Sequence, residues 1–159
     1  MRYFSLLLFV ALFVACGNDS AAVEQAALDA TNAAQEQAYE SMMEAHDRVM
    51  PLMGQITASQ RALKEALSTA DLPEDRKDLL TAAYEQLEDA NTGMMDWMQG
   101  VKPLDELRVG MDNDAIMTYI KEEAADIAKV EMAMTSAIAA AAELTGAAHT
   151  HEDGTTHEH

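Results

Sequence analysis

LTAAYEQLEDANTGMMDWMQGV (residues 80–101) is the stretch that decides the fold. Its apolar residues recur at alternating spacings of three and four, which places them along one face of an α-helix. The residues that form this seam are Leu80, Ala83, Leu87, Ala90, Met94, Trp97 and Val101. A helix with one apolar face buries it against other helices, so the stretch predicts a helical bundle.

Seams of the same kind lie on both sides of this stretch. On the N-terminal side the seam consists of Met42, Ala45, Val49, Leu52, Ile56, Leu63 and Leu67. On the C-terminal side it consists of Ile116, Ile120, Ile127, Val130, Met134, Ala137, Ala141 and Leu144. Three amphipathic segments in one chain predict an all-α, antiparallel three-helix bundle over residues 23–146.

Capping signals predict where the helices begin and end. We expect the first helix to run from about residue 23 to about residue 70. Asp71-Leu72-Pro73-Glu74 combines a capping box with an early proline, so the second helix should start there and end near Gly100. VKPLDELRVGMDN (residues 101–113) is expected to be a loop. Asn113 is then expected to cap a third helix that ends near Gly146.

Pro51 interrupts the first seam. A proline inside a helix removes one backbone hydrogen bond and disfavours the helical conformation of the residue before it. We therefore expect a kink at Met50 and Pro51. A complete break at this point would turn the three-helix bundle into a four-helix bundle, and both alternatives remain open.

The N-terminal stretch MRYFSLLLFVALFVAC (residues 1–16) indicates export. Basic Arg2 is followed by an apolar run that ends in small residues, as in a secretory signal peptide over residues 1–15. The run is shorter than the roughly 20 residues of a membrane-spanning helix. Phe13-Val14-Ala15-Cys16 resembles the lipobox of bacterial lipoproteins. The resemblance implies that Cys16 is lipidated, with palmitate among its acyl chains, and becomes the mature N-terminus.

Such an anchor implies a place in the bacterial cell envelope. The protein would be attached to a membrane by lipid and would face the periplasm or the outside. Residues 16–22 would form a lipidated tether between the membrane and the bundle. Cys16 is the only cysteine, so no disulfide can form within the chain.

Composition limits the partners. The chain has 159 residues, with 10 Lys and Arg against 28 Asp and Glu, and a formal net charge of −18 at pH 7. A surface this acidic repels nucleic acid and anionic lipid headgroups, so we expect no nucleic-acid partner. Cations are its natural small partners.

Methionine gathers around one histidine in MMEAHDRVMPLMG (residues 42–54). Helical geometry directs Met42 and Met53 toward the core but leaves Met43, His46 and Met50 on the flank. An antiparallel turn near residue 71 would place His46 opposite the neighbourhood of Asp96, within MMDWM (residues 94–98). The full candidate set is Met43, His46, Met50, Met94, Met95, Trp97 and Met98. The third helix is expected to bring Met111 and Met117 to the same end of the bundle.

Thioether sulfur and imidazole nitrogen together favour Cu(I) and Ag(I) over Mg²⁺, Ca²⁺ or Zn²⁺. The face of Trp97 can shield a bound cation through cation–π attraction. The set is therefore a candidate copper or silver site. The alternative is packing, because methionine is a flexible filler of helical cores.

The C-terminal stretch AAHTHEDGTTHEH (residues 147–159) has no apolar periodicity and is expected to be disordered and acidic. Its two His-x-His pairs consist of His149, His151, His157 and His159. Imidazoles at this spacing can chelate Cu²⁺, Zn²⁺ or Ni²⁺ weakly. Alternatively, the histidines only titrate in a solvated tail.

HDRVMPLMG, followed about forty residues later by MMDWM, resembles a family of small exported bacterial lipoproteins. Its members often carry the automatic label "viral A-type inclusion protein", and the resemblance covers roughly residues 38–145. It implies lipoprotein and helical character and no particular activity.

Motifs of catalysis are absent. The sequence has no phosphate loop, no His-Glu-x-x-His motif and no nucleophile elbow, so we expect no enzyme. Asp47 follows His46, but adjacent residues on a helix are not expected to face each other. Two hypotheses remain: an envelope lipoprotein that binds or buffers soft metal, and a non-catalytic lipoprotein that contacts an envelope protein or a second copy of itself.

Overall fold

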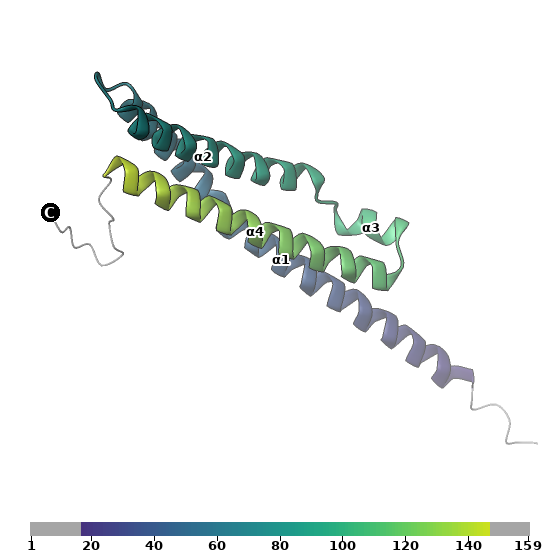
Figure 1. Cartoon of the computed structure of the whole chain (residues 1–159). Helices are drawn as coiled ribbons and strands as arrows, with labels where there is room; N and C mark the ends of the chain where they lie inside the picture. Colours follow the sequence, from purple (N-terminus) through teal and green to yellow (C-terminus); the bar gives the residue numbers. More distant parts are fainter. Residues whose placement is uncertain (1–16, 147–159) are drawn as a thin grey trace, which may run out of the picture.

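The computed structural model describes residues 17–146, which form four helices joined by short connections (Figure 1). The helices are α1 (Gly17–Leu67), α2 (Glu74–Gly100), α3 (Leu104–Gly110) and α4 (Asn113–Thr145). No strand occurs in this part of the chain. The all-α prediction is therefore confirmed.

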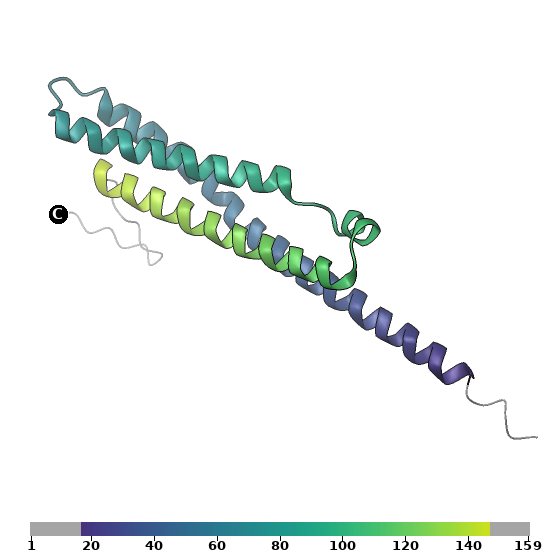
Figure 2. The same cartoon turned by 45° about the vertical axis from the view of Figure 1, so that its right-hand side comes forward.

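The three long helices form one bundle (Figures 1 and 2). α2 runs back along α1, and α4 then runs parallel to α1, with which it makes the most extensive contact. The apolar seams meet in one continuous core. Its fully or almost fully buried members include Met42, Val49, Ile56, Leu63, Leu80, Leu87, Met94, Ile116, Ile120, Ile127 and Met134. An up-down-up bundle is the arrangement that three amphipathic segments with short connections predict.

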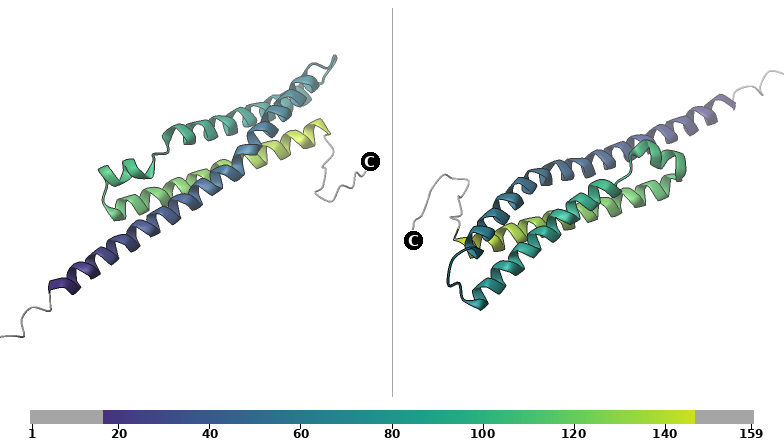
Figure 3. Two further views of the ribbon diagram at one scale, coloured as in Figure 1. Left: turned by 180° about the vertical axis from the view of Figure 1, so that it is seen from behind. Right: turned by 90° about the horizontal axis from the view of Figure 1, so that it is seen from above.

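α1 remains one helix through Pro51. Proline has no N–H to offer the carbonyl of Asp47, and α1 bends part-way along its length (Figure 3). The expected kinked first helix is thus found, and the four-helix alternative does not occur.

α1 is much longer than its partners. At 1.5 Å per residue it spans roughly 76 Å and α4 roughly 50 Å, so the N-terminal part of α1 projects beyond the bundle (Figure 1). Residues 20–30 are all exposed. The first helix was expected to begin only after a tether over residues 16–22. This boundary is wrong, because α1 already begins at Gly17.

Two predicted helix caps are wrong. Asp71 has a positive φ of 61° and lies in the turn before α2, whose N-cap is Pro73 without any side-chain cap. Pro73 pushes the residue before it out of the helical region, so the helix cannot start at Asp71. α4 is capped by Asp112, whose Oδ1 accepts a hydrogen bond from the Ala115 N–H at 2.9 Å. The C-cap of α4 is Gly146, in the left-handed conformation.

The predicted loop over residues 101–113 contains the short helix α3. Leu107 is buried in the core, and Arg108 binds three groups of α1. One of these is Gln35, which is fully buried and donates to Oδ1 of Asn113 at 3.0 Å. Asn113 therefore bridges helices instead of capping one.

None of the helices described for residues 17–146 is long and apolar enough to cross a bilayer.

Candidate soft-metal site

His46 and Trp97 stack on each other where α1 passes α2. Their ring centroids are 5.5 Å apart and their planes differ by 26°. The antiparallel arrangement expected from the sequence puts His46 opposite Asp96, one residue from Trp97. The expectation that His46 faces the neighbourhood of Asp96 is therefore confirmed.

Trp97 is fixed from two sides. It is 7% exposed, and its Nε1 donates to the carbonyl oxygen of Glu123 on α4 at 3.2 Å. The indole thus ties α2 to α4 and presents a face to His46 of α1. A ring held in this way is a rigid platform, because its polar edge has a partner and its body is packed.

His46 is oriented by its neighbour Asp47. Nδ1 of His46 lies 2.9 Å from Oδ1 of Asp47, and the imidazole side chain is 15% exposed. The expectation that these adjacent residues would not face each other is wrong, because the imidazole turns back toward the carboxylate. A carboxylate at Nδ1 favours the tautomer with the proton on Nδ1 and the lone pair on Nε2.

Nε2 of His46 is not sealed in the core. Within residues 17–146 it forms no hydrogen bond, and no buried side-chain nitrogen or oxygen there lacks a partner. An unpaired Nε2 must consequently be accessible. The imidazole therefore has one nitrogen held by the protein and one open to a ligand.

Three contacts fix how α1 is aligned with α2 and with the connection that follows α2. The Tyr39 hydroxyl donates to the Lys102 carbonyl at 3.1 Å, His46 stacks on Trp97, and Nζ of Lys64 lies 5.0 Å from the centroid of the Tyr84 ring. Tyr39, His46 and Met53 are seven residues apart and share one flank of α1. Met43 and Met50 lie one turn from His46 along the same flank.

The facing flank of α2 carries further methionines. Interpolation between the three contacts places Met50 level with Met94 and Met95, and Met43 level with Met98 and Gln99. Met43 and Met98 are half-buried and pack against the core, whereas Met50 and Met95 are each 38% exposed. By this register, methionines of both helices lie within about one helical turn of the level of the His46–Trp97 stack.

Met94 differs from the rest of the candidate set. It is 0% exposed and belongs to the core, as does Met42. A sulfur sealed in this way is explained by packing. Met94 therefore lies beside the site without opening onto it.

Met111 and Met117 lie farther away. The Tyr119 hydroxyl accepts from the Lys102 N–H at 2.8 Å, which places this part of α4 level with the connection after α2. Trp97 instead lies level with Glu123. Met111 and Met117 thus lie at the same end of the bundle, as expected, but nearer to α3 than the level of the His46–Trp97 stack.

The phenols of Tyr39 and Tyr119 hold the backbone of Lys102 between them. Burial raises the pKa of Tyr39 above its ordinary value. Burial also raises the pKa of Tyr119, against the opposing effect of the Lys102 N–H. Burial thus favours the protonated form of both phenols, and their hydrogen bonds to Lys102 fix the end of α2 just beyond Trp97.

Two other sets of candidate residues belong to the ends of the chain. Cys16 and the tail histidines His149, His151, His157 and His159 lie outside the described residues. Among residues 17–146, no three His, Cys, Asp or Glu side chains gather closely enough to hold a metal ion. In the described part, the candidate set therefore consists of the His46 imidazole, the Trp97 ring and methionine thioethers.

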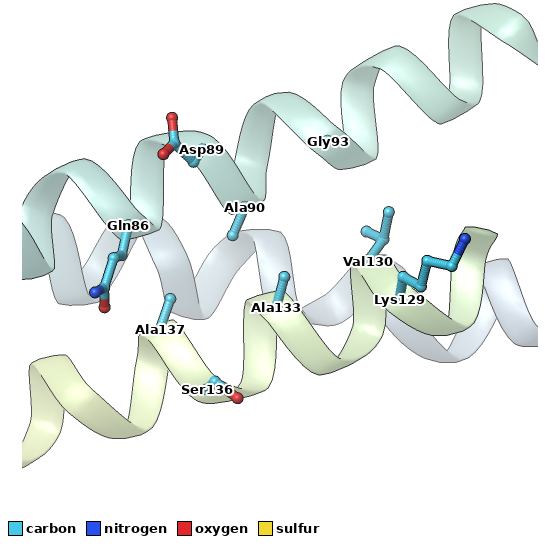
Figure 4. Close-up of a pocket in the computed structure, with 9 residues that line it drawn as sticks. All are labelled: Gln86, Asp89, Ala90, Gly93, Lys129, Val130, Ala133, Ser136 and Ala137. Carbon is cyan, nitrogen blue, oxygen red and sulfur yellow. The ribbon is translucent and has the colours of Figure 1, made fainter. Parts of the chain in front are cut away.

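A groove of about 560 Å³ opens elsewhere, between α2 and α4 (Figure 4). Small side chains such as Ala90, Ala133 and Ala137 form much of its wall, with Gln86, Asp89 and Lys129 at its edges. It contains none of the sulfur or imidazole groups of the candidate set. The groove and the His46–Trp97 stack are separate features.

No protein-family model, curated protein or solved structure matches this chain.

Proposed function

We propose that the chain is a lipid-anchored helical protein of the bacterial envelope that binds Cu(I) or Ag(I) between α1 and α2. The observation that carries the proposal is the His46–Trp97 stack, with Nδ1 of His46 on Asp47 and Nε2 open. An imidazole oriented by a carboxylate is typical of protein metal ligands. The function is binding or buffering of the metal, without catalysis.

The proposed ligands are Nε2 of His46 and thioethers from both helices. Met43 and Met50 lie on the His46 flank of α1, and Met95 and Met98 lie on the facing flank of α2. Met94 is left out because its sulfur is sealed in the core. These donors are soft and neutral, which suits a monovalent soft ion. The formal charge of −18 attracts cations to the surface without supplying soft ligands.

A silver titration tests the site, with Ag⁺ as a redox-stable substitute for Cu(I). The full chain is purified in detergent with His149, His151, His157 and His159 all changed to Gln, and is here named the tail-silent chain. Trp97 is the only tryptophan, so its fluorescence reports the site directly. We expect saturable quenching by one Ag⁺ per chain.

Matched variants separate the site from general sulfur binding. His46→Ala combined with Met50→Leu should remove the quenching while the helical circular dichroism persists. Met132→Leu changes an exposed methionine on α4 and should leave the quenching intact. Met→Leu substitutions keep volume and usually cost less than about 1.5 kcal/mol. Quenching that survives in the double variant would contradict the proposal.

Lipidation of Cys16 is the proposed anchor. The support is its sequence context, which resembles a lipobox. Labelled palmitate fed to expressing bacteria should appear on the parent chain and not on Cys16→Ser. Label on the Cys16→Ser chain would place the lipid elsewhere.

The tail histidines are proposed to gather divalent metal weakly and independently of the bundle. The parent chain should bind Cu²⁺ or Ni²⁺ weakly, and the tail-silent chain should lose this binding with its thermal unfolding unchanged. Equal binding by both chains would refute the role of the tail.

Protein interaction is the alternative function. The open groove between α2 and α4 favours it, because a bundle surface lined by small apolar residues can receive another helix. A tail-silent chain whose Trp97 does not respond to Ag⁺ would leave this alternative as the better explanation.

A further inference from the structure

The methionines near the site fall into two classes of exposure. Met42 and Met94 are 1% and 0% exposed, whereas Met50 and Met95 are each 38% exposed. Exposure governs how readily a thioether meets an oxidant dissolved in water. The two classes lie within a few residues of each other along the same helices, so one oxidant can distinguish them.

We propose that Met50 and Met95 form an oxidant-sensitive pair that switches soft-metal binding off while the fold is kept, an inference that rests on the proposed metal site. A hydroperoxide such as hydrogen peroxide is the oxidant. The sulfur lone pair attacks one peroxide oxygen and the O–O bond breaks. The sulfur loses two electrons and becomes a sulfoxide, and the second oxygen leaves as water.

The position of the pair makes the oxidation consequential. Met50 lies one turn from His46, and the register of the helices places it level with Met95 across the α1–α2 boundary. A sulfoxide presents a polar oxygen where a soft sulfur donor stood, so affinity for Cu(I) or Ag(I) is lost. Oxidation of Met50 and Met95 thus removes one thioether donor from each helix.

The same change leaves the bundle intact. The new oxygens at Met50 and Met95 lie at exposed positions, where water can solvate them. A sulfoxide at Met42 or Met94 would instead bury an unpaired polar group in the core, which is costly. The sealed methionines keep the fold and the exposed pair takes the oxidant.

Met111 and Met132 supply an internal control. They are 39% and 63% exposed, so peroxide reaches them as well. Neither belongs to the proposed ligand set, and Met132 lies on α4. Their oxidation should leave metal binding unchanged.

The test treats the tail-silent chain with hydrogen peroxide and maps each methionine by peptide mass spectrometry. We expect sulfoxide at Met50, Met95, Met111 and Met132, reduced sulfur at Met42 and Met94, unchanged circular dichroism and loss of the Ag⁺ response. Ag⁺ added before peroxide should protect Met50 and Met95 but not Met111 or Met132. Methionine sulfoxide reductase should restore the response.

The outcomes separate the switch from the site. If Ag⁺ quenches the reduced chain and still quenches it after full oxidation of Met50 and Met95, the switch is wrong and the metal site stands. Oxidation of Met42 or Met94 as fast as Met50 also overturns the switch. If Ag⁺ does not quench the reduced chain, the metal site is wrong and the switch is rejected with it. A chain with Met111→Leu and Met132→Leu should lose its Ag⁺ quenching after peroxide treatment, as the parent does. If Ag⁺ still quenches Trp97 in this chain after peroxide treatment, the switch is also wrong.

Discussion

Nε of Arg108 donates a hydrogen bond of 3.1 Å to Oε1 of Gln35, which joins α3 to α1 across 73 positions of the chain. Gln35 is fully buried and stands at a core position of α1, seven residues before Met42. Its amide nitrogen donates to Oδ1 of Asn113. One buried side chain therefore links α1, α3 and the start of α4.

Arg108→Ala should destabilise the bundle and release α3. Its loss leaves the carbonyl oxygen of Gln35 without a partner, and an unsatisfied buried acceptor typically costs about 1–3 kcal/mol. Hydrogen exchange should show faster exchange of the α3 amides, and urea unfolding should show a lower free energy of unfolding.

Arg61→Ala is the matched control for Arg108→Ala. Arg61 is exposed on α1 and makes no hydrogen bond or ion pair with any described residue. Its removal should change stability by no more than about 0.5 kcal/mol. Equal effects of the two substitutions would show that lost charge, and not the bond to Gln35, is responsible.

Gly93→Ala should stabilise the protein. Gly93 lies inside α2, and a Cβ added there would meet Cγ2 of Val130 at 3.9 Å, an ordinary van der Waals distance. Alanine in place of glycine within a helix contributes about 0.5–1 kcal/mol. The midpoint of urea unfolding should rise.

Gly146→Ala should have the opposite effect. Gly146 ends α4 with a φ of 67°, where a Cβ is strained whatever the space around it. A cost of roughly 1 kcal/mol is expected. If both alanines stabilise, the left-handed conformation of Gly146 is not required to end α4.

Tyr39 and Tyr119 should make the fold sensitive to alkali. Burial raises the pKa of both phenols above the ordinary value of 10.0. The stabilisation is fully present below pH 10, because both states are then neutral. Above pH 10 the unfolded chain ionises first, so the free energy of unfolding falls as pH rises.

Urea unfolding at neutral pH and above pH 10 measures this loss. Tyr39→Phe removes one titrating group and should show a smaller alkaline loss than the parent, although it begins less stable without its bond to Lys102. The raised pKa values of Lys64 and Lys129 act in the same direction in both chains. An unchanged alkaline loss in Tyr39→Phe would assign the effect to other groups.

The sequence pattern predicted the three long helices because each apolar seam lies within one continuous segment of the chain. Leu80, Leu87 and Met94 recur every seven positions, and all three are fully buried. The same periodicity and one turn were enough to bring His46 to within one residue of its partner Trp97. Regular helices carry such positional information over long distances.

Long-range hydrogen bonds account for what the sequence did not reveal. α3 is held by Arg108 binding residues more than seventy positions away, and no local pattern records that pairing. Pro103 followed by Asp105 and Glu106 was nevertheless a readable helix start, with acidic residues in the first turn. The exposure of Met50 against the burial of Met94 also depended on how three helices meet.

Asp47→Ala should weaken Ag⁺ binding while His46 remains in place on α1. In the parent, Oδ1 of Asp47 lies 2.9 Å from Nδ1 of His46, so the carboxylate favours the tautomer that keeps the lone pair on Nε2. Without it the imidazole can turn and take the other tautomer. Loss of such an orienting group typically lowers metal affinity about 10- to 100-fold. Titration of Trp97 fluorescence measures the affinity, and nitrogen-15 NMR of His46 reports the tautomer.

Glu44→Ala is the control, because it removes the same charge from an exposed position two residues before His46. The field of either carboxylate acts on a cation in the same way, but only Asp47 holds the imidazole. Equal losses in the two variants would mean that Asp47 acts through charge alone and does not orient His46.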